Sequence, residues 1–195
     1  PCLSRITIAA PGGTANISHI INALPSFWNL KSIQLNLASQ SLWKRLFGHL
    51  QNHEITEIGH VPFSIPLLNA MPHSVTSLSL IEPLKFDNGY NSSADSGGML
   101  LEPLRLAKLI RVKLGSMMLN SIALEEFVSA LPDGVEWIEY GCEFDRMFNH
   151  ARFRRCHSLE IRFARWPCTI DLPSPDQLPP CLTSLSVFAG SSPYE

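Results

Sequence analysis

The chain has 195 residues, a length typical of one domain, and its 15 lysines and arginines face 17 aspartates and glutamates. Hydrophobic residues make up 45% and charged residues 16%, so the chain can bury enough apolar surface to fold, and wholesale disorder is excluded. The net charge of −2 removes any general electrostatic case for nucleic acid or an anionic membrane as partner. We therefore expect one domain over residues 1–195 and do not expect nucleic acid as a partner.

Two stretches without acidic or basic residues, 6–30 and 58–81, are the candidates for a membrane span. Prolines interrupt both, so neither holds the run of about 20 apolar residues that a spanning helix needs. No signal peptide is recognisable, because Arg5 is followed by only four apolar residues before Pro11. Five cysteines without a CxxC pair indicate a reducing compartment. We expect no membrane contact, an intracellular, cytoplasmic location, and, since the sequence starts at Pro1, a piece of a longer chain.

A motif recurs along the whole chain: an apolar residue, two residues of any kind, then an apolar, any and an apolar residue. Its eight copies begin at Leu3, Leu30, Ile55, Val75, Leu109, Val135, Cys156 and Leu182. The third copy has His60 in the last apolar place. The copies are 20 to 34 residues apart, on average about 26, a period typical of strand-plus-helix repeats. The longest interval contains residues 87–98, whose Gly, Asn, Ser and Asp predict a surface loop insertion.

Short helical patterns lie between these predicted strands. They cover residues 14–24, 39–51, 64–71, 98–107, 121–131 and 145–154. Three of them end in nearly the same tetrapeptide, at 22–25, 69–72 and 129–132, where a proline ends the helix and begins an extended segment. In the second pattern, Leu42, Leu46, Phe47 and Leu50 form one apolar stripe. Each repeat is thus one strand and one helix, and stacked repeats share a continuous core.

The fold class we expect is α/β, as a solenoid of about eight strand-helix repeats with a parallel, concave sheet. The alternative is a three-layer α/β domain, whose strands are usually apolar on both faces because helices cover both. Here the strands alternate instead, with Ser77 and Ser79 between apolar residues in one copy and Ser184 and Ser186 in another. That alternation favours the solenoid, with one face of the sheet in water.

These residues resemble the leucine-rich-repeat family, above all the strand-plus-helix type of ribonuclease-inhibitor-like and F-box-associated proteins. The repeats with Ala-Leu-Pro before the strand are also similar to repeats of secreted effectors of intracellular bacteria. The family pattern continues with an asparagine three residues after the strand motif, a position that holds Pro11, Ala38 and Pro83 in three of the copies here. The resemblance implies a protein-binding solenoid. A substrate adaptor and an effector acting in a host cytoplasm both remain open.

Residues that could carry chemistry do not form a specific pattern. Candidate zinc ligands are present, but no two have the close spacing of a structural site: Cys142, His150, Cys156, His157, Cys168 and Cys181. Cys156 takes an apolar place of its repeat, which predicts a core residue. Cys142 resembles the nucleophile of bacterial ubiquitin ligases only loosely, since Asp145 follows it at a different spacing. We expect no enzyme, no metal and no cofactor.

The alternating strand residues give the candidate interaction surface. If the apolar places face the core, their neighbours line the concave face by the period of two. Charge of both signs gathers there around Trp137, and interface hot spots are rich in Trp and Arg. The predicted partner-binding residues are Gln34, Asn36, Arg111, Lys113, Trp137, Glu139, Glu160, Arg162 and Phe188. The predicted function is a non-enzymatic module that binds a protein partner through this face.

A second hypothesis is a structural subunit of a larger assembly, in which a ribonucleoprotein is one option. It would contact its partners through its edges and through the arginine-rich segment that holds Arg152, Arg154, Arg155, Arg162 and Arg165. Neither end has an obvious polar cap, so we also expect flanking sequence, self-association or a partner at the open ends.

Overall fold

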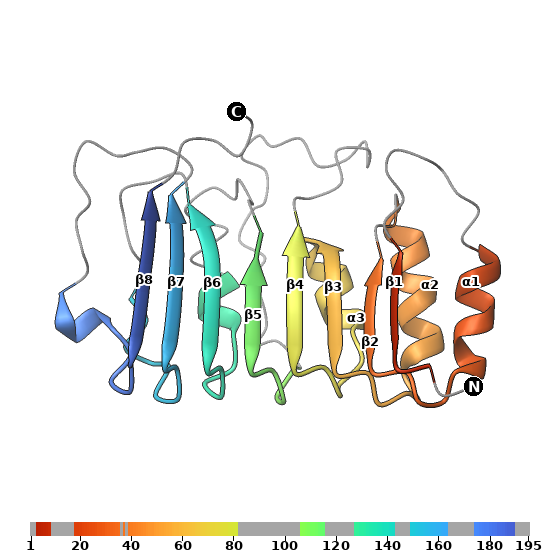
Figure 1. The fold of residues 1–195 in the computed structure, drawn as a ribbon, viewed down its shortest axis with the longest axis horizontal. Helices are drawn as coiled ribbons and strands as arrows, with labels where there is room; N and C mark the ends of the chain where they lie inside the picture. Colours follow the sequence, from red (N-terminus) through yellow and green to blue (C-terminus); the bar gives the residue numbers. More distant parts are fainter. Residues whose placement is uncertain are drawn as a thin grey trace.

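A computed structural model describes residues 3–8, 18–35, 37, 39–81, 106–115, 127–142, 149–163 and 174–189. Its centre is one open sheet of eight strands, all parallel, whose order in space is the order in sequence (Figure 1). The strands are β1 (Arg5–Ile8), β2 (Ser32–Leu35), β3 (Glu57–Pro62), β4 (Ser77–Ile81), β5 (Arg111–Leu114), β6 (Trp137–Cys142), β7 (Ser158–Phe163) and β8 (Ser184–Ala189). The predicted α/β class and parallel sheet are confirmed.

The described helices are short. They are α1 (Ser18–Ala23), α2 (Gln40–Leu50) and α3 (Ile65–Ala70), with 3-10 turns η1 (Leu24–Ser26) and η2 (Pro175–Gln177) and a further helical turn at 127–130. Ser39 caps α2 by accepting a hydrogen bond from the Leu42 backbone N–H at 3.2 Å. The stripe of α2 is buried at Leu46, Phe47 and Leu50, together with Trp43, which the pattern did not include.

The strand registers align the repeats. The middle apolar residues of successive strands pair in one row, which runs from Ile6 through Ile33, Ile58, Leu78, Val112, Ile138 and Leu159 to Leu185. From Ile33 to Leu159 these residues are at most 1% exposed and share one core with the inner side of α2. The period-two alternation predicted from the sequence is confirmed in β4, β5 and β7, whereas β2, β3 and β8 do not alternate regularly: in β8, Ser184 and Leu185 are both exposed.

The same backbone turn precedes most strands. The backbone N–H donates to the carbonyl three residues earlier, at 2.9–3.3 Å, in Leu30, Val75, Leu109, Val135, Cys156 and Leu182. The residue just before each of the strands β1–β7 uses its backbone carbonyl to accept two N–H groups of the following repeat. The Thr56 carbonyl, for example, accepts from the N–H groups of Thr76 and Ser77, both at 2.9 Å. Seven carbonyls repeat this arrangement and form a ladder along the sheet: Ser4, Lys31, Thr56, Thr76, Ile110, Glu136 and His157.

Two expectations about the strands need correction. The last apolar place of the third copy is not His60 but Val61, because the β3–β4 register shifts between Ile58 and Val61. His60 is exposed, with a φ of 63°, and Val61 is fully buried. Leu185 is 39% exposed, because β8 has a neighbouring strand on one side only.

The predicted helix at 145–154 is wrong in its described part, where residues 149–154 are not helical and residues 151–152 form a turn. The Asn149 side chain accepts a hydrogen bond from the Ala151 N–H, a local bond that competes with helix formation. Leu106 and Ala107, at the end of the predicted helix 98–107, are also not helical. The predicted insertion at 87–98 lies outside the described residues.

Candidate functional site

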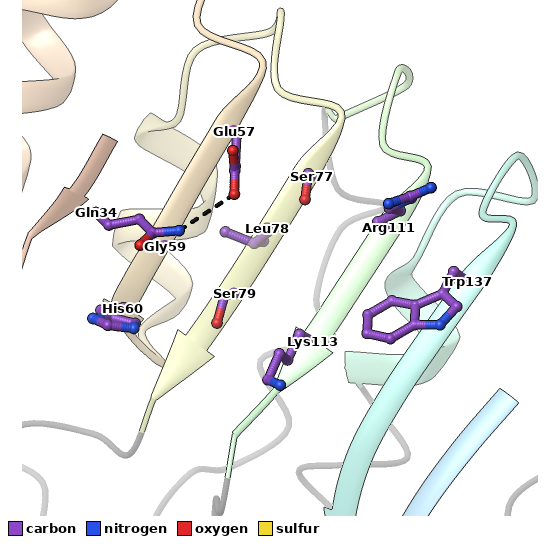
Figure 2. Close-up of a pocket in the computed structure, with 10 residues that line it drawn as sticks. All are labelled: Gln34, Glu57, Gly59, His60, Ser77, Leu78, Ser79, Arg111, Lys113 and Trp137. Atoms are coloured by element: carbon purple, nitrogen blue, oxygen red, sulfur yellow. Dashed lines mark hydrogen bonds between the residues drawn. The ribbon is translucent and has the colours of Figure 1, made fainter. Parts of the chain in front are cut away.

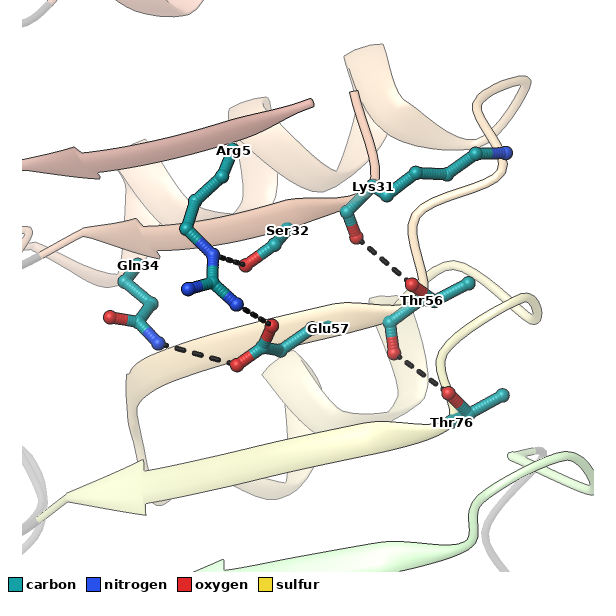
Figure 3. A network of polar contacts seen from close by, with 7 residues as sticks. All are labelled: Arg5, Lys31, Ser32, Gln34, Thr56, Glu57 and Thr76. Atoms are coloured by element: carbon teal, nitrogen blue, oxygen red, sulfur yellow. Dashed lines mark hydrogen bonds and ion pairs between the residues drawn. The ribbon is translucent and has the colours of Figure 1, made fainter. Parts of the chain in front are cut away.

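One face of the sheet carries the polar strand residues, and we call it the open face. For strands β1–β6, Figures 2 and 3 show side chains of this face in front of the strands, with helices behind the sheet. Its first row, set by the registers, holds Arg5, Ser32, Glu57, Ser77, Arg111, Trp137, Ser158 and Ser184. Further along the strands lie Thr7, Gln34, Ser79, Lys113, Glu139, Glu160 and Ser186, and then Arg162 and Phe188. A parallel sheet usually has both faces covered, so a polar face of this kind is itself unusual.

At the β1–β3 end, a polar network centres on Glu57 (Figure 3). Arg5 donates from Nη2 to Glu57 Oε2 at 3.1 Å and from Nε to Ser32 Oγ at 3.3 Å. Gln34 donates from Nε2 to Glu57 Oε1 at 3.3 Å. The Ser32 hydroxyl, followed by the Arg5 guanidinium and the Gln34 amide, lowers the pKa of the Glu57 carboxyl. Both oxygens of this carboxylate are therefore occupied within the sheet.

At the β5–β8 end, a second network centres on Glu139, which is only 4% exposed. Its Oε1 lies 2.9 Å from Lys113 Nζ and 3.1 Å from Arg162 Nε. Arg162 also pairs with Glu160, and its guanidinium lies 5.2 Å from the centroid of the Phe188 ring. Glu139 thus holds both cations in place from below, while Phe188, 50% exposed, provides the outer apolar contact.

Between the two networks lies a hollow of about 380 Å³ (Figure 2). It is lined by Gln34, Glu57, Gly59, His60, Ser77, Leu78, Ser79, Arg111, Lys113 and Trp137. A second hollow, of about 550 Å³, continues from Glu57, Ser77 and Arg111 toward the start of the strands. Arg111 belongs to both, and among the described residues no acidic side chain forms an ion pair with it. The half-buried indole of Trp137 lies beside Arg111 in the paired strand.

The rim of the hollow depends on the bulge in β3. Gly59 packs against Gln34, so closely that a Cβ added to it would lie 2.9 Å from Gln34 Cγ. His60 follows with its left-handed φ of 63°, a conformation that costs energy for a residue with a Cβ. This backbone turns the His60 side chain to the same face as the serines of β4.

The structure brings four predicted site residues together at the hollow, namely Gln34, Arg111, Lys113 and Trp137. Four others form the second network: Glu139, Glu160, Arg162 and Phe188. Asn36 lies outside the described residues. The predicted set did not include His60 or Glu57. Strand parity does predict Glu57 on this face, whereas His60 reaches it only through the bulge.

The cysteines and histidines do not form a site in the described part of the chain, where no three potential metal ligands gather. Cys156 is fully buried, as its place in the repeat predicted, and its Sγ donates to the Ser158 carbonyl at 3.3 Å. Burial raises the pKa of this thiol to about 11, so it is protonated at neutral pH and a poor nucleophile. His150 is buried and its ring stacks on Tyr140. Cys168 lies outside the described residues.

The arginine-rich segment is partly engaged inside the molecule. Arg152 Nη2 donates at 2.6 Å to the carbonyls of Val128 and Leu131, at the end of the helical turn 127–130. Its guanidinium also lies 4.4 Å from the Phe153 ring centroid. Arg152 therefore stabilises the turn, while Arg154 and Arg155 are exposed. Arg165 lies outside the described residues.

Comparisons with known proteins found no match for this chain among family models, curated proteins or solved structures. In the described residues, no helix has the length and apolar character needed to cross a bilayer.

Proposed function

We propose that this chain is a leucine-rich-repeat-type solenoid that binds a protein partner through its open face and carries out no catalysis. Support for the repeat class comes from the regular spacing of the strand motif and from the backbone turn and carbonyl ladder that recur with it. Arg111 and Trp137 are the central contacts in this proposal, with Gln34 and Lys113 beside them. A substrate adaptor and an effector are the two roles that such a module would fill.

The observation that carries the proposal is the state of Arg111. Glu57 and Glu139 are both held by cations of the same face, whereas Arg111 lies between them at a hollow and has no such partner among the residues that the structure describes. The indole of Trp137 borders the same hollow. An unpaired arginine beside a half-buried tryptophan has the composition of an interface hot spot.

The structural-subunit hypothesis depends on the arginine-rich segment, and the bonds of Arg152 to the Val128 and Leu131 carbonyls give that residue an internal role. We therefore retain the open face as the proposed interaction surface. The edges of the molecule serve as the matched comparison in the test.

The test is affinity capture from cell lysate with the wild-type chain and a Trp137→Ala/Arg111→Glu variant, with mass spectrometry to identify the bound proteins. The control is Trp28→Ala/Arg154→Glu, which makes the same two chemical changes at exposed positions away from the open face. We expect a partner that binds the wild type and the control but not the open-face variant. Partners lost only from the control would refute the proposal and favour the edges.

A further inference from the structure

We infer that the hollow at the centre of the open face binds a carboxylate side chain of an acidic, extended partner segment, with Arg111 as its ion-pair partner. This inference rests on the proposed function and specifies the chemistry of the partner. Three observations carry it: the charge balance of the open face, the surroundings of Arg111, and the bulge that brings His60 to the rim.

The described strand residues of the open face include one more cation than carboxylates. Among the described residues, the open face has four cations, Arg5, Arg111, Lys113 and Arg162, and three carboxylates, Glu57, Glu139 and Glu160. Each carboxylate has at least one ion pair within the face. Glu136, which lines the second hollow together with Arg111, lies 3.9 Å from His157 and forms no ion pair with Arg111, so among the described residues one positive charge of this face has no ion-pair partner. A single negative charge complements it.

The surroundings of Arg111 are suited to an oxyanion. Register pairs Arg111 with Ser77 on one side and Trp137 on the other. Ser77 and Ser79 present hydroxyl groups to the same hollow, and within the described part neither has a side-chain hydrogen bond. Trp137 lines the same hollow, so its indole adds apolar surface to the wall that a bound carboxylate side chain would face. Guanidinium groups bind carboxylates in a bidentate geometry, so Arg111 supplies direction as well as charge.

A carboxylate fits better than a phosphate ester. A phosphate group carries a charge of about −1.5 to −2 at neutral pH and therefore favours more than one free cation. The other cation of the hollow, Lys113, already lies 2.9 Å from the buried Glu139 carboxylate. His60 lies on the rim of the hollow, where its ring N–H is available as a hydrogen-bond donor, and its left-handed φ of 63° is a conformation of higher energy for a residue with a Cβ. The strained residue thus faces the space in which the ligand group would bind.

The test uses the full chain and a phage-displayed library of random 12-residue peptides, selected in parallel on the wild type, Arg111→Glu and the control Arg154→Glu. We expect Asp and Glu to be enriched in peptides from the wild type and the control, and this enrichment to disappear with Arg111→Glu. No acidic enrichment, or no peptide that binds the wild type, would overturn the inference. Peptides without acidic residues that lose binding with Trp137→Ala would overturn it while leaving the proposed function in place.

The best acidic peptide then serves as the probe for a double-mutant cycle measured by fluorescence anisotropy. Replacing its key Glu by Gln should weaken binding to the wild type about 10- to 100-fold, as expected for a charged hydrogen-bonded pair, and have little effect with Arg111→Gln. Equal losses in both proteins would overturn the assignment to Arg111. If phosphoserine at the same place binds more than about tenfold tighter than Glu, the hollow is a phosphate site and the carboxylate assignment is wrong.

His60→Gly is the variant that cannot fail merely by unfolding, because glycine adopts a φ of 63° without strain. We expect it to fold at least as stably as the wild type and to bind the acidic peptide several-fold more weakly. Unchanged peptide affinity in a correctly folded His60→Gly variant would remove His60 from the site.

Discussion

Leu159 and Leu185 occupy the same place in neighbouring strands and pair in the β7–β8 register, so replacing each by alanine makes an identical chemical change at two levels of burial. Leu159 is fully buried and Leu185 is 39% exposed. Removing the outer carbons of a buried leucine costs about 2.4 kcal/mol in transfer free energy, at roughly 0.8 kcal/mol per carbon. At Leu159 an unfilled cavity raises this cost, to a total of about 2.5–5 kcal/mol.

At Leu185 the same change loses only the transfer free energy of the buried part of the side chain, and it leaves no enclosed cavity. The expected cost is about 1.5 kcal/mol. Urea unfolding followed by circular dichroism measures both values as free energies of unfolding, provided that the slopes with denaturant stay alike. Equal losses for Leu159→Ala and Leu185→Ala would refute the reasoning, because they would mean that the apolar side of β8 is as well covered as that of β7.

Three further predictions concern the open face and the cysteines. Gly59→Ala places a Cβ against Gln34, so the Gln34 amide should leave Glu57 and the pKa of Glu57 should rise toward its ordinary value; an unchanged NMR titration of Glu57 would contradict this. The folded-state pKa of Glu57 is lowered, so its ionised carboxylate stabilises the fold above about pH 4.5, and this stabilisation is lost as the pH falls through the folded pKa. The Glu57→Gln variant lacks this carboxylate. Its free energy of unfolding, measured by urea titration, should therefore fall less between pH 7 and about pH 3 than that of the wild type. The native protein treated with iodoacetamide at neutral pH should be alkylated at the exposed Cys181 and protected at Cys156, as peptide mass spectrometry can check; rapid labelling of Cys156 would show that this part of the core opens.

Much of the sheet could be predicted from the sequence because the pattern of apolar residues that forms it repeats along the chain. The first apolar place of each copy and the alternation after it depend only on which side chains can be buried, and a slip of one residue would turn every side chain to the wrong face. Residues such as Val112 and Ile138 therefore have the burial that the pattern predicts. The positions of Arg111 and Trp137 on the open face follow from the same rule.

The features that the sequence did not predict lie where a single residue interrupts the repeating pattern of apolar residues. The extra residue in β3 moves His60 out of the core and puts Val61 in its place, and no local pattern distinguishes such a bulge from a regular strand. Asn149 offers the backbone a competing hydrogen bond, so the apolar spacing of 145–154 overstated its helical tendency. The pairing of Glu139 with both Lys113 and Arg162 depends on three strands meeting in space and on side-chain reach, which parity alone does not determine.

The order of the strands, which the carbonyl ladder connects, also affects how the chain folds. Every strand pairs with the strand next to it in the sequence, and paired residues are only 19 to 34 positions apart. Loops of this length close at a modest entropic cost, so each repeat can dock on its predecessor soon after it is synthesised, without waiting for the distant end of the chain. Assembly in one direction, one repeat at a time, is the route that this contact order favours during translation.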